Sequence, residues 1–153
     1  MTTAYLILKY LHVLLAIAAV GANITYGIWL TRTARQSAHL EHVLRGIKFL
    51  DDRVANPAFV LLLATGVAMV YVGRIPWTTP WILTSIMLYV LLAAGGLLGY
   101  SGQLRRQIAA LAGGSDSLQY RAAAGRAQLT GILLMIIMLA IVFLMVTKPA
   151  LWG

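Results

Sequence analysis

Four long apolar stretches, separated by polar connections, dominate the pattern of this chain. They cover about residues 5–30, 56–72, 81–102 and 128–147. Because a helix rises about 1.5 Å per residue, roughly 20 apolar residues cross the hydrocarbon core of a bilayer. The pattern therefore predicts an all-α protein with four transmembrane helices. Short connections favour an antiparallel four-helix transmembrane bundle, formed by one integral membrane domain over residues 1–153.

The polar connections carry helical signals of their own. Residues 37–50 place apolar side chains at intervals of three and four among charged ones, which predicts an amphipathic helix. Residues 113–117 read GGSDS and predict a turn, with a helix resuming at about Leu118. We therefore expect the third and fourth helices to extend beyond the membrane as a basic hairpin.

Composition supports the membrane class. Of the 153 residues, 61% are hydrophobic and only 10% are charged, whereas roughly a quarter of a typical soluble domain is charged. The main expected partner is thus the lipid bilayer. The net charge of +8 raises the question of nucleic acid. The basic residues lie between the apolar stretches and form no stripe with exposed aromatic residues, so we expect no nucleic-acid binding.

The basic residues also predict an orientation. They gather in two connections, as Arg32, Arg35, Arg45, Lys48 and Arg53, and as Arg105, Arg106, Arg121 and Arg126. The connection at residues 73–80 and the C-terminal tail carry one basic residue each. By the positive-inside rule, both basic connections should be cytoplasmic and both termini external. The cytoplasmic connections should then contact anionic lipids.

The first apolar stretch contains polar residues that are costly at membrane depth. Spacings of three and four connect its polar and small residues into one stripe, which we expect to face the bundle interior: Lys9, His12, Ala16, Ala19, Asn23, Tyr26 and Gly27. Asn23 is expected to bond Asn56 of the next helix. The run Asp51, Asp52 and Arg53 is expected to form ion pairs within a loop.

His12 is the strongest candidate for chemistry, because imidazole ligates haem iron and copper. With the termini external, it shares the external half of the bundle with Lys9, Met69, Met138 and Met145. A histidine and a methionine can be the axial pair of haem b, here His12 with Met138 or Met145. Lys9 could pair with a propionate or reach the headgroups. A copper site would use His12 and Met69. Hydrogen bonding by the histidine and packing by the methionines are the structural alternatives.

Three stretches resemble small bacterial membrane families with four spans. LKYLHVLLAIAAVGANITYGIWLTR resembles their first helix, with an early Lys and His, a glycine and a basic end. RVANPAFVLLLATGVAMVYVG is similar to their second helix, and PWILTSIMLYVLLAAGGLLGYSGQLRR to their third. The match is to an uncharacterised group of predicted integral membrane proteins. It extends to HemJ-type protoporphyrinogen oxidases and CopD-type copper resistance membrane domains.

The resemblance implies a place in the bacterial inner membrane and two kinds of chemistry. HemJ-type proteins bind haem b and oxidise protoporphyrinogen IX, and their first-helix histidine corresponds to His12. Their third-helix lysine has no counterpart, since Thr84 and Ser85 occupy that region. CopD-type domains imply copper handling near the external face, again through His12.

Three functions remain open from the sequence. The leading hypothesis is a haem b-binding membrane protein with a redox role, which would make it a haem-dependent oxidoreductase. The second is a protein that handles copper or a small solute. The third is a structural subunit without a ligand. In that case Gly95, Gly96 and Gly99 would serve packing within the chain or in a homo-oligomer.

Overall fold

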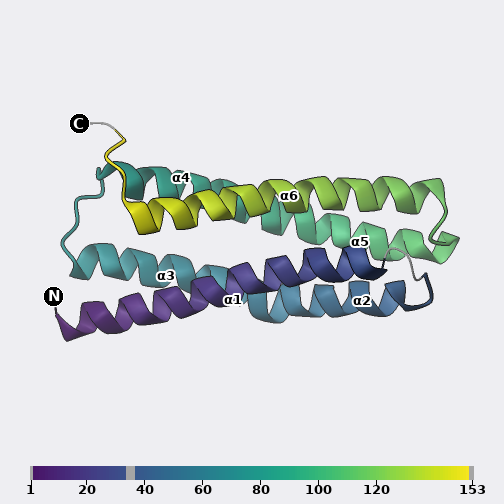
Figure 1. The fold of residues 1–153 in the computed structure, drawn as a ribbon, viewed down its shortest axis with the longest axis horizontal. Coiled ribbons are helices and arrows are strands. Elements are labelled where there is room, and N and C mark those ends of the chain that lie inside the picture. The colour runs from purple at the N-terminus through teal and green to yellow at the C-terminus, as the bar shows by residue number, and fades with distance from the viewer. Residues whose placement is uncertain (1, 34–36, 152–153) are drawn as a thin grey trace.

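The structure is a computed structural model that describes residues 2–33 and 37–151. Arg35, which was counted in the first basic connection, lies outside these residues. The described chain is helical with no strand, and it forms four long rods side by side (Figure 1). The predicted all-α fold and its four apolar spans are confirmed.

The four rods contain six α-helices and three short irregular turns. The α-helices are α1 (Thr3–Thr33), α2 (Ser37–Leu50), α3 (Asn56–Val72), α4 (Pro80–Ala94), α5 (Ser101–Ala110) and α6 (Leu118–Thr147). Two π-helical turns, η1 (Asp51–Ala55) and η2 (Gly95–Tyr100), join α2 to α3 and α4 to α5, and the 3-10 turn η3 (Leu111–Gly113) follows α5. The second and third rods are therefore continuous helices with one π-turn each.

The helices predicted in the polar connections are present. The amphipathic helix of residues 37–50 is α2, and the last helix begins at Leu118 as expected. Ser117 caps α6 by accepting a hydrogen bond from the Tyr120 amide at 3.2 Å. Gly114 has a φ of 94° in the turn before it, a conformation that suits glycine. We call this end of the bundle the basic end, and the end with Thr3 and Thr147 the terminal end.

The rods pack as two pairs. α1 lies along α3, and α6 lies along α4 and α5 (Figure 1). In the second pair, a Cβ added to Gly95 would meet Leu134 Cδ2 at 2.7 Å, and one added to Gly99 would meet Thr130 at 3.8 Å. The glycines thus bring α6 close to its partner rod. Two of the three glycines predicted to serve packing do so within the chain.

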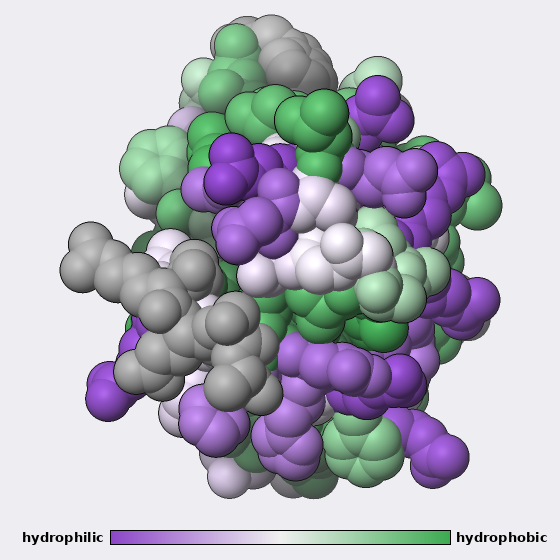
Figure 2. All heavy atoms as spheres, turned by 90° about the vertical axis from the view of Figure 1, so that its right-hand side faces the viewer, coloured by the Kyte–Doolittle hydropathy of each residue, from purple (hydrophilic) through white to green (hydrophobic). Residues whose placement is uncertain are grey.

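The two pairs are joined mainly at the basic end. There α2 contacts α1 and α5, and a core cluster contains Leu44 and Leu104, both fully buried, with Tyr26, Tyr100 and Tyr120. Figure 2 shows hydrophilic side chains over the outside of this end. Along the spans the outer surface is apolar, as at Leu98, which is 85% exposed. This pattern suits a protein whose solvent changes from water to lipid along its length.

The predicted inward stripe on α1 is only partly correct. Ala19 and Tyr26 are buried, and His12 and Asn23 are half-buried. Lys9 and Gly27 are exposed, so their prediction was wrong. Alternating steps of three and four fall about 20° behind the contact face for every seven residues. Gly27 directly follows the buried Tyr26 and therefore lies about 100° around the helix from it.

The core at the basic end should dominate stability. We expect Leu104→Ala to lower the free energy of unfolding by about 2–5 kcal/mol, because it leaves a cavity in a fully buried position. Leu98→Ala is the matched control, since its side chain is exposed in the same rod, and it should have little effect. Thermal unfolding of both variants in detergent would measure this, and equal losses would contradict the assigned core.

Candidate functional site

His12 lies where α1 faces α3. Its Nδ1 is 2.8 Å from the Thr65 hydroxyl oxygen, and the ring lies against Gly66, where an added Cβ would be 3.2 Å from Cε1. The glycine therefore makes room for the imidazole between the two helices. A larger residue at Gly66 would compete with the ring for this space.

The hydrogen bonds around Thr65 indicate the tautomer of His12. The Thr65 hydroxyl donates to the backbone carbonyls of Leu61 at 2.8 Å and Leu62 at 3.1 Å. When the single hydroxyl proton is given to these carbonyls, the Thr65 oxygen accepts a hydrogen bond from Nδ1–H. In a neutral imidazole, Nε2 then carries the free lone pair. Metal-binding histidines commonly have this arrangement, in which one ring nitrogen is held and the other is available.

Two other predicted site residues lie close to His12 along the helices. His12 faces Gly66, and the Tyr5 ring approaches Gly73, so Met69 lies on α3 between these two contacts. Met69 is half-buried, about one helical turn from Gly66. Lys9 is exposed and lies on α1, nearer the terminal end than His12.

The two methionines predicted as haem ligands are on α6 at different depths. Met138 is buried and Met145 is half-buried. The contact of Gly95 with Leu134 sets the pairing of α4 with α6, and the Tyr89 hydroxyl, which donates to the Phe59 carbonyl, links α4 to α3. Neighbouring rods are antiparallel, so each pairing fixes which residues of two rods lie at the same depth. Together these pairings place Met145 at the depth of His12. They put Met138 about two helical turns nearer the basic end.

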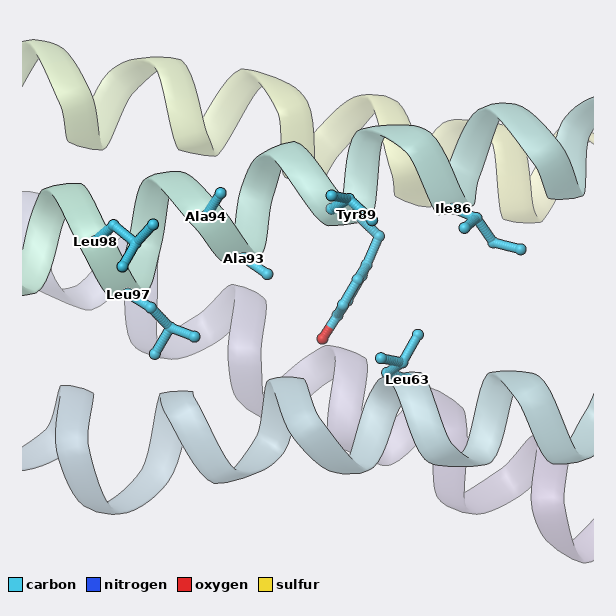
Figure 3. Close-up of a pocket in the computed structure, with 8 residues that line it drawn as sticks. Leu63, Ile86, Tyr89, Ala93, Ala94, Leu97 and Leu98 are labelled. Carbon is cyan, nitrogen blue, oxygen red and sulfur yellow. The ribbon is translucent and has the colours of Figure 1, made fainter.

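An apolar groove of about 380 Å³ lies between α3 and α4 (Figure 3). Figure 3 shows the Tyr89 side chain reaching from α4 towards α3, with Leu63 opposite. Leu63 lines the groove from α3, whereas His12, Thr65 and Gly66 are not among its lining residues. The remaining lining residues are Ile86, Val90, Ala93, Ala94, Leu97 and Leu98.

A second polar site, at the basic end, was missed by the sequence analysis. Asp51 is buried and its Oδ2 accepts a hydrogen bond from the Ser101 hydroxyl at 2.7 Å. The predicted loop ion pair was therefore wrong for Asp51, whereas Asp52 does pair, with Lys48. A signal was available: Asp51 continues the spacing of three and four that connects the buried apolar residues of α2, which places it on their face.

Two further predictions concern polar and metal-binding side chains. The Asn23 side chain donates to the Ala19 carbonyl of its own helix at 2.9 Å, so the predicted bond to Asn56 was wrong. Within residues 2–33 and 37–151, no group of three or more His, Cys, Asp or Glu side chains could hold a metal ion. Metal binding here would have to use a different donor set, such as one imidazole with thioethers or a macrocycle.

Comparison with known proteins gives one match. A family model described as predicted integral membrane protein (DUF2269) matches residues 6–149. No curated protein and no solved structure matches the chain.

Thr65 should control the state of the His12 ring. We expect Thr65→Val to remove the acceptor of Nδ1–H, to lower the free energy of unfolding by about 0.5–1.5 kcal/mol, and to populate the other tautomer. NMR spectroscopy of the imidazole nitrogens would detect this. Thr25→Val is the matched control, since the Thr25 hydroxyl bonds only the Gly21 carbonyl of its own helix. Unchanged His12 signals in Thr65→Val would refute the assigned bond.

Proposed function

Because the chain belongs to the DUF2269 family of predicted integral membrane proteins, we propose that it acts within the bilayer. We propose further that it binds haem b with a redox role and that His12 is an axial ligand. The observation that carries this proposal is the 2.8 Å contact between His12 Nδ1 and the Thr65 hydroxyl, which holds one ring nitrogen and leaves Nε2 for a ligand bond.

The residues around His12 suit haem b. Imidazole is a common ligand of haem iron. The groove between α3 and α4, which His12 does not line, offers the hydrocarbon surroundings that a porphyrin ring requires. When bound, haem supplies one-electron chemistry. His12 would hold the iron, Thr65 would fix the ring orientation, and Gly66 would leave space for the imidazole.

Met145 would be the second residue to hold the haem, because the helix pairings put it level with His12. Met138 is the alternative, deeper in the bundle. The exposed ammonium of Lys9 suits either a haem propionate or the lipid headgroups. Protoporphyrinogen oxidation is not included in the proposal. Where HemJ-type proteins have a lysine, this chain has Thr84, which bonds the Pro80 carbonyl, and Ser85, which is buried.

Copper handling is the second candidate, and the position of Met69 favours it. Met69 lies about one helical turn from the residue that His12 contacts, so an imidazole and a thioether could meet between α1 and α3. Imidazole and thioether together suit copper. Metal analysis of the purified protein, with and without Met69→Leu, would separate this function from haem binding.

We propose that the basic end lies in the cytoplasm of a bacterial cell, with the protein in the inner membrane and both termini external. The arginines and lysines of α2, α5 and the start of α6 support this orientation. It places His12 in the external half of the bundle. It also places the basic side chains beside the anionic lipids of the inner leaflet.

Haem binding makes a spectroscopic prediction. We expect protein purified in detergent after haem supplementation to show a Soret band, and His12→Ala to lose it. Thr65→Val should weaken haem binding about 10- to 100-fold, the usual effect of losing a partner that orients a ligand. Titration with haem, followed by absorbance, would measure both effects.

His42→Ala is the control, because His42 is exposed on α2 and should leave the band unchanged. Absence of a Soret band in the unmodified protein, or a band that survives His12→Ala, would overturn the haem proposal. If metal analysis also found no copper, the structural-subunit hypothesis would remain.

The orientation can be tested directly because the chain has no cysteine. Thr78→Cys places one thiol in the connection between α3 and α4, and Ala112→Cys places one in η3, both at exposed positions. We expect a membrane-impermeant maleimide to label Thr78→Cys in intact cells and Ala112→Cys only after permeabilisation. The reverse labelling would show that the orientation is inverted.

A further inference from the structure

A buried carboxylate lies where the two π-helical turns of the bundle meet. Asp51 is the first residue of η1 and is 7% exposed. Ser101, which donates to it, directly follows η2. π-turns are rare and frequently occur at functional sites. Two such turns, joined by one hydrogen bond to a buried acid, mark this place as a candidate binding site.

The charge of Asp51 is not balanced by a salt bridge. The chain has twelve Lys and Arg residues against four Asp and Glu, so basic partners are plentiful. Nevertheless, among the described residues the salt bridges join Arg45 to Glu41, Lys48 to Asp52 and Arg121 to Asp116. Lys48 acts on Asp51 through space but bonds its neighbour Asp52. Besides Ser101, the uncharged side chain of Asn56 also stabilises the Asp51 carboxylate. A buried carboxylate normally requires a partner of opposite charge.

A second buried polar group faces the same place from α1. Tyr26 is 2% exposed, and its hydroxyl is buried without a hydrogen-bond partner. Tyr26 packs in one core cluster with Ala55 of η1 and Tyr100 of η2, which places it beside the two π-turns. Buried hydroxyls are rarely left unsatisfied, and each such case in a folded protein calls for an explanation.

We propose that Asp51, Ser101 and Tyr26 form a binding site for one monovalent alkali cation, for which sodium is the probe. The donors are a carboxylate, an alcohol and a phenol, and oxygen-only sets of this kind suit hard cations. One carboxylate balances one positive charge, whereas sites for divalent ions generally use several. The cation would neutralise Asp51 and give the Tyr26 hydroxyl a partner.

The site lies within reach of the aqueous phase. Asp51 precedes the first residue of α3 by five positions, so it lies just on the basic side of the membrane span. A water molecule bridging Tyr26 and Asp51 is the other way to satisfy these groups. That water would leave stability independent of the cation in solution, which allows a direct test.

The experiment measures thermal unfolding of the full-length protein in detergent, in sodium chloride or choline chloride at equal ionic strength. A cation that binds only the folded state stabilises it in proportion to the logarithm of its concentration above its Kd. We therefore expect the Tm to rise steadily with sodium concentration in the unmodified protein. Asp51→Asn should abolish this dependence.

Tyr26→Phe separates a cation site from a purely structural role. Removing an unsatisfied buried hydroxyl should leave a merely structural residue neutral or stabilising, whereas a cation site should lose sodium affinity and shift its titration to higher concentration. Asp52→Asn is the matched control. It removes the adjacent, exposed carboxylate and should keep the sodium dependence.

Three results would overturn the proposal. The first is an equal Tm in sodium and choline for the unmodified protein. The second is a sodium dependence of the Tm that survives both Asp51→Asn and Tyr26→Phe. The third is a Tm that responds to pH but not to sodium, which would identify a proton as the bound cation. If Asp51→Asn does not fold, the comparison of Tyr26→Phe with Asp52→Asn decides the question. Because His12 is not involved, the outcome is independent of haem binding.

Discussion

The structure depends on close helix contact in a solvent that does not drive helices together. Lipid tails are as apolar as leucine, so burying one apolar side chain against another gains little within the membrane. The chain therefore uses small residues where rods must approach, Gly66 between α1 and α3 and Gly95 between α4 and α6. At the basic end, α2 and α5 add a water-excluded core of the ordinary kind.

Much of this architecture could be predicted from the sequence, because the requirement that an apolar segment form a helix in lipid applies to each segment separately. An apolar run of bilayer length has to be a helix, and the spacing in residues 37–50 identifies α2 without reference to the rest of the chain. What could not be predicted depends on pairing. That His12 meets Thr65 follows from the register of α1 on α3, which no local pattern contains.

The burial of Asp51 is a second feature that depends on helix pairing and that the local sequence did not reveal. Its sequence neighbours Asp52 and Arg53 suggest a solvated loop, yet the chain continues through this position as an unbroken helix. Burial of Asp51 follows from the position of Ser101 on a distant segment. The two polar sites therefore arise differently: the one at His12 is visible as an unusual residue in an apolar run, and the one at Asp51 appears only when two π-turns meet.

The apolar groove beside Tyr89 opens on the lipid-facing surface of the bundle. Its rim includes Leu97 and Leu98, both exposed on the outer surface of the span. A hydrophobic molecule dissolved in the membrane could thus arrive sideways, by diffusion in two dimensions, without passing through water. The fraction of grooves occupied would then depend on the concentration of that molecule in the bilayer. A molecule that partitions strongly into lipid reaches a high concentration there, so it could fill the groove even with weak affinity.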